Sequence, residues 1–371
     1  MRNILRLTTA IAAVAALAGT AAVAHNQMSA SNSAQPHSAK PGMSAPEKPA
    51  PASAAKGSWV QPGTKGSPID GAAFHAQVLL DAAGFSPGVI DGKKGMSLDN
   101  SVKGFQQARG MKTTGKLDNA TKVALLQQNR PSTIMVKLSP DQVAGPFVYP
   151  FPKKAEDQAK LKFMGYRNML EKLAEEFHTT PATIIALNGP DKMIGAGQTL
   201  RLPNVIPANA NYDVGGKQDA GRYMKLLNVA AGQIKGDHII VDKSEGLLKV
   251  FDAGEKLLAQ FPVTTGSGHD PLPLGDWKVT TYAFLPPFNY QPDLFWDVAD
   301  DKAEQKLPPG PNGPVGLAWL DLTKEHYGIH GTSEPQTIGR TQSHGCLRLT
   351  NWDVLRLSQM LKPGFKAEFV A

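Results

Sequence analysis

The segment Ser343-His344-Gly345-Cys346-Leu347-Arg348 contains the single cysteine of the 371-residue chain, and His330 lies 16 positions before that cysteine. A thiol attacks a carbonyl as the thiolate, so Cys346 needs a base or a lowered pKa. His330 is the natural base, because the unperturbed pKa of histidine lies close to neutrality. The stretch therefore predicts a cysteine nucleophile assisted by a histidine.

The residues that surround the cysteine suit the same chemistry. Gly345 lets the backbone approach a substrate, and nearby N–H groups could hold an oxyanion. Arg348 offers a fork for a substrate carboxylate. Thr350-Asn351-Trp352-Asp353 has the pattern of a capping box. It would open a helix with an apolar side of Val354, Leu355, Leu357, Met360 and Leu361. The partial positive charge at the start of that helix would favour the thiolate.

Two other interpretations of the cysteine are weaker. A lone cysteine is often a small buried hydrophobe, but this segment, rich in polar residues and glycine, is a poor apolar packing site. His330, His344 and Cys346 could together bind zinc, but no recognised zinc spacing is present. We therefore expect no metal and no cofactor.

Composition limits the class of protein. A single cysteine excludes a disulfide scaffold and a multi-cysteine zinc or iron–sulfur site. The formal net charge is +7, yet no basic run or aromatic-interleaved basic motif supports nucleic-acid binding. The charge is compatible with an anionic envelope polymer as partner, and equally with a solvated surface that has none.

The N-terminus has the features of a secretory signal peptide. Arg2 and Arg6 precede an apolar stretch, and Ala22-Val23-Ala24 is a small-x-small cleavage pattern. We expect residues 1–24 to be removed; the alternative is an uncleaved membrane anchor, for which the apolar run is short. Residues 25–66 are rich in Ala, Ser, Pro, Gly and Lys, which predicts a disordered linker.

Residues 67–130 are expected to form a small all-α domain of three helices, with Asp118 as the N-cap of the third. The motifs Gly84-Phe85, Val89-Ile90-Asp91-Gly92, Phe105-Gln106, Thr114-Gly115 and Leu117-Asp118 resemble the three-helix peptidoglycan-binding domain. The resemblance implies binding to cell-wall glycan. A helical spacer that binds nothing is the alternative, because a fold can outlive its binding function.

Residues 131–236 are expected to be a linker that contains a small α+β module at about 161–205. Leu170, Leu173, Ala174 and Phe177 form one apolar helix face, and Thr180-Pro181 has the pattern of an N-cap followed by proline. The ending from Gly195 to Pro203 resembles that of a LysM module, but no clear Gly-Asp-Thr-Leu entry precedes the first helix. Glycan binding and a purely structural role are both open here.

Residues 237–371 predict a mostly-β domain with one C-terminal helix. Short apolar runs typical of strands cover 238–242, 247–251, 257–263, 277–280, 315–322 and 327–330. A loop rich in proline and aromatic residues covers roughly 284–314, either as a lid or as a fixed cover.

The whole stretch 237–371 resembles the YkuD-type catalytic domain of L,D-transpeptidases. The resemblance rests on His330-Gly331-Thr332 and on the cysteine segment 343–348, and the course of 241–244, 261–266 and 274–279 agrees with it. The upstream wall-binding resemblance points independently to the same substrate.

The resemblance implies a definite reaction. The cysteine attacks the carbonyl of the third stem-peptide residue, the terminal D-alanine leaves, and a side-chain amine of a neighbouring stem resolves the thioester to a 3→3 cross-link. By this resemblance Cys346 is the nucleophile and His330 the general acid/base. The implied loop, oxyanion and substrate-binding residues are Ser343, His344, Gly345, Arg348, Gly331, Thr332 and Tyr327.

Two other functions remain open at the level of sequence. Water could resolve the same thioester, which would make the protein an L,D-carboxypeptidase or a cross-link hydrolase. The chain could also be a non-catalytic wall-binding protein. In each case we expect peptidoglycan stem peptides and glycan as partners, no nucleic acid, no membrane insertion after signal cleavage, and a Gram-negative periplasm as the compartment.

Overall fold

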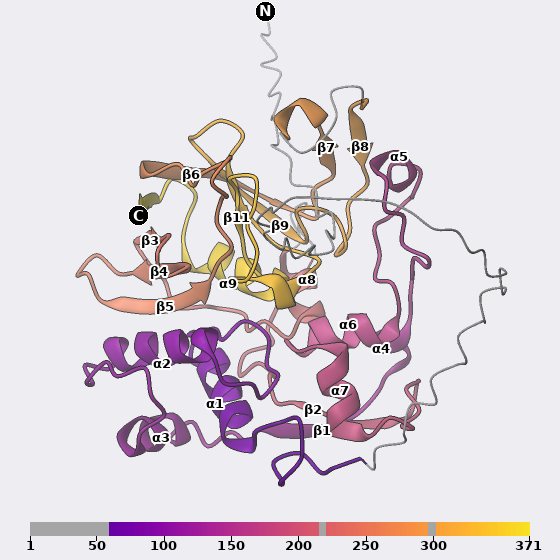
Figure 1. The fold of residues 1–371 in the computed structure, drawn as a ribbon, viewed down its shortest axis with the longest axis vertical. Coiled ribbons are helices and arrows are strands. Elements are labelled where there is room, and N and C mark those ends of the chain that lie inside the picture. Colours follow the sequence, from indigo (N-terminus) through magenta and orange to yellow (C-terminus); the bar gives the residue numbers. More distant parts are fainter. Residues whose placement is uncertain (1–58, 215–219, 296–301) are drawn as a thin grey trace, which may run out of the picture. The chain divides into compact units, whose positions relative to one another are not determined.

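The computed structural model describes residues 59–214, 220–295 and 302–371 (Figure 1). The expected signal peptide and the expected linker as far as residue 58 lie outside the described residues. The last part of that linker already makes tertiary contacts, since the Trp59 indole Nε1–H donates to the Ala186 carbonyl at 2.7 Å. Among the described residues, no helix combines the length and the apolar character that a membrane span requires.

The first module is the expected bundle of three helices, α1 (Gly71–Ala82), α2 (Met96–Ala108) and α3 (Asn119–Leu126). Asp118 caps α3 as the sequence predicts, because its carboxylate accepts from the Thr121 amide at 2.9 Å. Phe74, Leu80, Val102 and Phe105 are buried between the helices or against neighbouring elements, which explains the apolar spacing.

The second module, defined here as residues 133–203, has strands at both ends. Its elements are β1 (Thr133–Lys137), α4 (Pro140–Val143), α5 (Ala155–Gln158), α6 (Met169–Glu176), α7 (Pro181–Asn188) and β2 (Thr199–Pro203). β1 pairs antiparallel with β2, from Thr133 opposite Pro203 to Lys137 opposite Thr199. The sequence interpretation began this module at about residue 161 and left β1 in a linker, because the partner strand lies more than 60 residues away in the chain.

The third module is built on an eight-stranded sheet of order β11-β10-β9-β6-β12-β3-β4-β5. The module's elements are α8 (Ala220–Leu226), β3 (His238–Asp242), β4 (Leu247–Phe251), β5 (Leu257–Pro262), β6 (Gly275–Phe284), β7 (Phe288–Tyr290), η1 (Pro292–Leu294), β8 (Gln305–Leu307), β9 (Ala318–Leu322), β10 (Gly328–His330), η2 (Pro335–Thr337), β11 (Leu347–Arg348), α9 (Asn351–Met360) and β12 (Lys366–Val370). The mostly-β prediction is confirmed.

Two parts of this module differ from the sequence interpretation. The C-terminal strand β12, which the interpretation did not include, lies inside the sheet, parallel to β3 and antiparallel to β6. The region expected as a loop over 284–314 contains the antiparallel pair β7–β8, with Phe288 opposite Leu307. Both pairings depend on distant partners that local sequence patterns do not reveal.

The first module covers the β5 edge of the sheet, and Figure 1 shows α2 running beside this strand. Gln260 of β5 accepts from the Ser86 amide at 2.9 Å through its backbone, and its side chain donates to the Asn100 carbonyl at 2.8 Å. The contact satisfies an edge that would otherwise present unpaired backbone groups.

A buried charge network joins the three modules beneath α9. Arg356 of α9 donates to both carboxylate oxygens of Asp81 of α1, at 2.8 and 2.7 Å. His178, which follows α6, approaches Asp81 at 3.1 Å and stacks on Trp352 of α9. Ser86 donates to Asp353 at 2.7 Å. The start of α9 is therefore fixed by residues from all three modules.

Candidate active site

Two short parallel strands bring the predicted nucleophile and base together. β10 ends at His330, and β11 starts directly after Cys346. The register places Ile329 opposite Leu347 and His330 opposite Arg348. His330 therefore ends one strand, and Cys346 directly precedes the strand that pairs with it.

His330 is held in one tautomer. Its ring is buried, and Nδ1 lies 2.7 Å from the Gly331 carbonyl oxygen, so Nδ1 carries the hydrogen and donates it. Nε2 is then the unprotonated nitrogen, and it has no hydrogen-bond partner among the described residues. Burial lowers the pKa of His330 to about 3, with Arg348 acting in the same direction. The imidazole is neutral at rest, with a lone pair available for a proton.

The Cys346 thiol is also neutral at rest. Sγ is buried and donates to the His326 carbonyl oxygen at 3.7 Å. Burial raises the pKa of Cys346 to about 11, although the Gly328 N–H and the Arg348 cation both favour the thiolate. The sequence analysis expected the start of α9 to favour the thiolate, and desolvation outweighs that contribution here.

The residues before the cysteine form a tied loop. Ser343 Oγ donates to the Cys346 carbonyl at 2.6 Å, and its backbone pairs with Thr265 and Ser267. Gly345 has a φ of 100°, and a Cβ there would lie 2.6 Å from Cε1 of Tyr327. Glycine is therefore required both by the backbone conformation and by the tyrosine ring. Tyr327 forms a wall of this loop.

The other predicted site residues lie on β10 and β11 or in the segments that flank these strands. The largely buried Arg348 guanidinium follows the cysteine on β11, and burial lowers the pKa of this group to about 10. Gly331 and Thr332 follow His330; the Thr332 hydroxyl accepts from the Glu334 amide at 3.2 Å. His344 contacts Phe295 edge to face, with ring centroids 5.0 Å apart. All nine predicted residues therefore lie on the paired strands β10 and β11 or in the segments next to them.

Aromatic and apolar side chains cover the thiol. Cys346 belongs to a buried cluster with Met164, Phe288, Tyr290, Phe295, Leu307, Val315 and Trp319. Most of these residues come from the 284–314 region, and Met164 comes from the second module. A substrate carbonyl can reach Sγ only when part of this cover is displaced.

Two neighbours of the pair were not among the predicted site residues. Trp319 of β9 stacks on His330, with centroids 5.4 Å apart and an interplanar angle of 17°. Asn351, the first residue of α9, is fully buried against Gly331. Trp319 stands in an apolar strand run that gave no functional signal, whereas Asn351 was counted as part of the helix cap.

The predicted capping box is half formed. Thr350 accepts from the Asp353 amide at 3.1 Å, which confirms the N-cap. The Asp353 carboxylate accepts from Ser86 and Arg356 instead of returning to the Thr350 backbone. The interdomain network therefore uses the side chain that the local pattern assigned to the cap.

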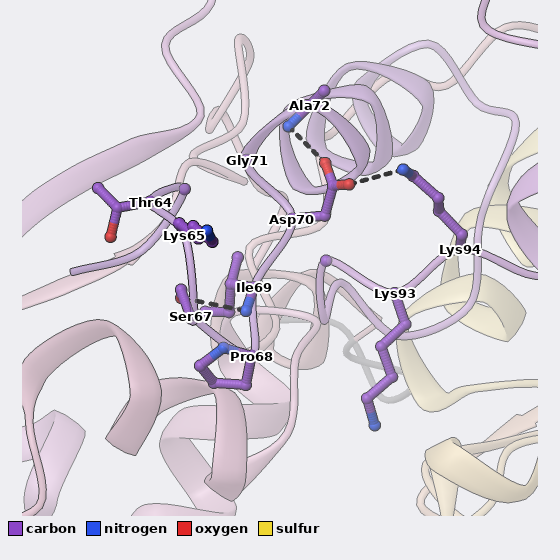
Figure 2. Close-up of a pocket in the computed structure, with 12 residues that line it drawn as sticks. Thr64, Lys65, Ser67, Pro68, Ile69, Asp70, Gly71, Ala72, Lys93 and Lys94 are labelled. Carbon is purple, nitrogen blue, oxygen red and sulfur yellow. Dashed lines mark hydrogen bonds and ion pairs between the residues drawn. The ribbon is translucent and has the colours of Figure 1, made fainter. Parts of the chain in front are cut away.

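A hollow in the first module contains other polar groups (Figure 2). Asp70 caps α1 by accepting from the Ala72 amide, and it pairs with Lys94 at 2.7 Å. Lys93 approaches Asp91 at 3.7 Å. The residues that line the hollow include neither cysteine nor histidine. Across the described residues, no group of three or more His, Cys, Asp and Glu side chains is arranged to hold a metal.

The site combines a thiol, a single-tautomer imidazole, a glycine-dependent loop and a nearby cation on the strands of a mostly-β domain. This combination is chemically that of a thiol-dependent acyl-transfer domain. It is attached to a small helical domain that resembles a cell-wall-binding unit.

Comparison with known proteins assigns two of the domains. Residues 236–368 match the YkuD L,D-transpeptidase catalytic domain, and residues 74–125 match a peptidoglycan-binding domain. The third module is therefore an L,D-transpeptidase catalytic domain of the YkuD type. No comparison identifies the second module as a LysM module, so that resemblance stays a prediction.

Relatives with this name occur in several bacteria. An L,D-transpeptidase named YkuD from Bacillus licheniformis is 27% identical over 200 residues, which are 53% of this chain and 89% of the relative. The YkuD protein of Bacillus subtilis is 50% identical over 54 residues, 15% of this chain and 33% of that protein. A solved L,D-transpeptidase from Mycobacterium smegmatis has 19% identity and a TM-score of 0.30, over 37% of this chain and 59% of that chain.

Proposed function

We propose that the mature chain is an exported peptidoglycan L,D-transpeptidase with Cys346 as nucleophile and His330 as general acid/base. The observation that carries the proposal is the state of His330. Its Nδ1–H is committed to the Gly331 carbonyl, while Nε2 faces no competing donor among the described residues. An unprotonated Nε2 can take the proton of the Cys346 thiol, which directly precedes the neighbouring strand β11.

The first half-reaction forms a thioester. Cys346 Sγ attacks the carbonyl carbon of the third stem residue while the thiol proton passes to His330 Nε2. The tetrahedral intermediate collapses as the C–N bond to D-alanine breaks, and Nε2 returns the proton to the leaving amine. The pair starts neutral, with a pKa of about 11 for the thiol and about 3 for the imidazole, so the proton would move together with the attack on the carbonyl and not before it.

The second half-reaction consumes the thioester. The side-chain amine of a neighbouring stem attacks the acyl carbon, His330 Nε2 accepts a proton from that amine, and the proton returns to the departing sulfur. The product is a 3→3 cross-link and free enzyme.

The other predicted residues would support these steps. Ser343, His344 and Gly345 shape the loop whose N–H groups would hold the oxyanion, and Tyr327 forms its wall. Arg348 would orient the loop or a substrate carboxylate. Gly331 and Thr332 form the segment that follows His330, and the Gly331 carbonyl accepts the His330 Nδ1–H. We place the enzyme in the Gram-negative periplasm, with peptidoglycan stems and glycan as partners.

A product analysis tests the proposal. The mature chain is incubated with a purified disaccharide-tetrapeptide, and the products are read by mass spectrometry. Dimers that lack one D-alanine are expected from the wild type and none from Cys346→Ala. Tripeptide monomers without dimers would replace the transpeptidase by a carboxypeptidase. Unchanged activity in Cys346→Ala would refute the assignment of the nucleophile.

A further inference from the structure

The second module contacts the catalytic domain at Asn351, which lies against Gly331, the residue that follows the candidate base. Asn351 is fully buried, and its Nδ2 donates to Glu175 Oε1 of α6 at 2.7 Å. Glu175 itself is 5% exposed, which is unusual for a carboxyl group. A buried carboxyl at a boundary between modules has to be held by specific partners.

Asn351 connects this carboxyl to the histidine. Its Oδ1 accepts from the Leu317 amide at 2.9 Å, and a Cβ built on Gly331 would lie only 2.0 Å from that oxygen. The amide group therefore lies on the side of the Gly331 Cα where a side chain would otherwise stand. The carbonyl of Gly331 is the acceptor for His330 Nδ1–H at 2.7 Å. A continuous series of contacts leads from Glu175 through Asn351 and Gly331 to the imidazole.

The other carboxylate oxygen of Glu175, Oε2, has its partner inside the second module. The Tyr166 hydroxyl donates to Oε2 at 2.5 Å, and Tyr166 is itself buried. Burial raises the pKa of Glu175 to about 7, although both donors favour the ionised form. Both oxygens of the carboxyl group thus have directed partners, one in each module.

We propose that Glu175 is a positioning residue for the transfer reaction: through Asn351 it fixes the Gly331 carbonyl that orients His330. The second module then completes the active site in addition to any contact with the cell wall. The inference rests on the proposed role of His330. A displacement of a catalytic group by about 1 Å can lower a rate about 100-fold, so a distant anchor of this kind has a measurable effect.

The chain offers a matched control in the next residue. Glu176 lies on the same helix, is 7% exposed, and burial raises its pKa to about 7 as well. Its carboxylate accepts from Gln142 of the second module at 2.6 Å, whereas the carboxylate that accepts from Asn351 is that of Glu175. Replacing Glu176 removes a similarly buried carboxyl without breaking the series of contacts that leads to His330.

The experiment compares Glu175→Ala, Glu175→Gln and Glu176→Ala in the mature full chain, with wild type. Turnover of the disaccharide-tetrapeptide gives kcat and KM, and iodoacetamide alkylation of Cys346 across pH gives a readout that needs no peptidoglycan. We expect Glu175→Ala to lower kcat at least about tenfold with KM within about twofold, and to change the alkylation profile. Glu176→Ala should leave both close to wild type.

The conservative variant separates positioning from folding. In Glu175→Gln the amide oxygen can still accept from Asn351, and the amide N–H can donate to the Tyr166 oxygen, so a large part of the lost rate should return. If Glu175→Ala does not fold by circular dichroism, Tyr166→Phe, which removes one anchor of the carboxyl group, should show a smaller loss in the same direction.

Three outcomes would overturn the inference: equal losses in Glu175→Ala and Glu176→Ala, no loss in Glu175→Ala, or no recovery in Glu175→Gln. If wild type converts no tetrapeptide but Glu175→Ala still changes the alkylation profile of Cys346, the proposed function fails and the positioning role stands. If neither readout responds to Glu175→Ala, the positioning role fails.

Discussion

Removal of Asp81 or Arg356 should strongly destabilise the mature chain, because it breaks the buried ion pair that joins the first module to α9. The two side chains are 2% and 8% exposed and share two hydrogen bonds. Removing one partner of a buried pair leaves an uncompensated charge and typically costs about 3–5 kcal/mol. With a urea m-value of about 3 kcal/mol/M, the unfolding midpoint should fall by roughly 1–1.7 M.

A double-mutant cycle isolates the pair. Urea unfolding at pH 7, followed by circular dichroism, is measured for Asp81→Asn, Arg356→Met and the double variant. The double variant should lose less than the sum of the single losses, by at least about 1 kcal/mol, because neither charge is then left alone. Asp157→Ala breaks the exposed pair with Lys160 and serves as the control, with no measurable change in midpoint.

The pH dependence follows from the same contacts. Burial alone would raise the pKa of Asp81, but Arg356 and His178 outweigh it and hold this pKa well below its ordinary value of 3.8. The stabilisation should therefore be complete above about pH 4 and be lost as the pH falls further. Single losses below about 1 kcal/mol, or losses that add fully in the double variant, would refute the reasoning.

Three further predictions concern the site and its supports. Because burial raises the pKa of Cys346 to about 11, its iodoacetamide alkylation in the free enzyme should be slow at pH 7, and the rate should rise about tenfold per pH unit. An inflection near pH 7 in the plot of alkylation rate against pH would contradict this prediction. Gly345→Ala should abolish turnover, because a Cβ would meet the Tyr327 ring. Gly339→Ala is the control: its φ is 71° and the space around its Cβ is open, so it should cost only about 1–3 kcal/mol of backbone strain and leave turnover measurable. Equal turnover in the two variants would exclude the steric argument. Burial raises the pKa of Glu175 and Glu176 to about 7 from 4.5, so the native state holds these protons to a higher pH than the unfolded state does. The free energy of unfolding should therefore fall as the pH rises from 4.5 to 7, by on the order of 3 kcal/mol per group. If Glu176→Gln shows the same dependence of the free energy of unfolding on pH as the wild type, Glu176 makes no contribution to it.

The sequence was sufficient where the determinants are local. The apolar runs at 238–242 and 247–251 form β3 and β4 as predicted, since each run alternates or packs on both faces. Asp118, Thr180 and Thr350 each accept a backbone N–H at the start of a helix, as their positions indicate. Short-range hydrogen bonds of this kind depend on a few neighbouring residues only.

Features created by distant contacts could not be predicted in this way. Asp81 and Arg356 are 275 residues apart in the chain, and four helices, α4 to α7, separate β1 from its partner β2. The electrostatic state of the candidate site is a further case. The sequence indicated an activated thiol. In the structure, Met164 and apolar residues of the 284–314 region desolvate Cys346, which raises the pKa of the thiol and favours its neutral form.

The central claim is that Cys346 carries the acyl group, and trapping of the acyl-enzyme tests it most directly. The mature chain is mixed with disaccharide-tetrapeptide, quenched in acid within the first turnover, and examined by intact-protein and peptide mass spectrometry. We predict an adduct of the disaccharide-tripeptide acyl group on the peptide that contains Cys346, and none in Cys346→Ala. Turnover of the substrate without an adduct at Cys346, or an adduct on another residue, would contradict it.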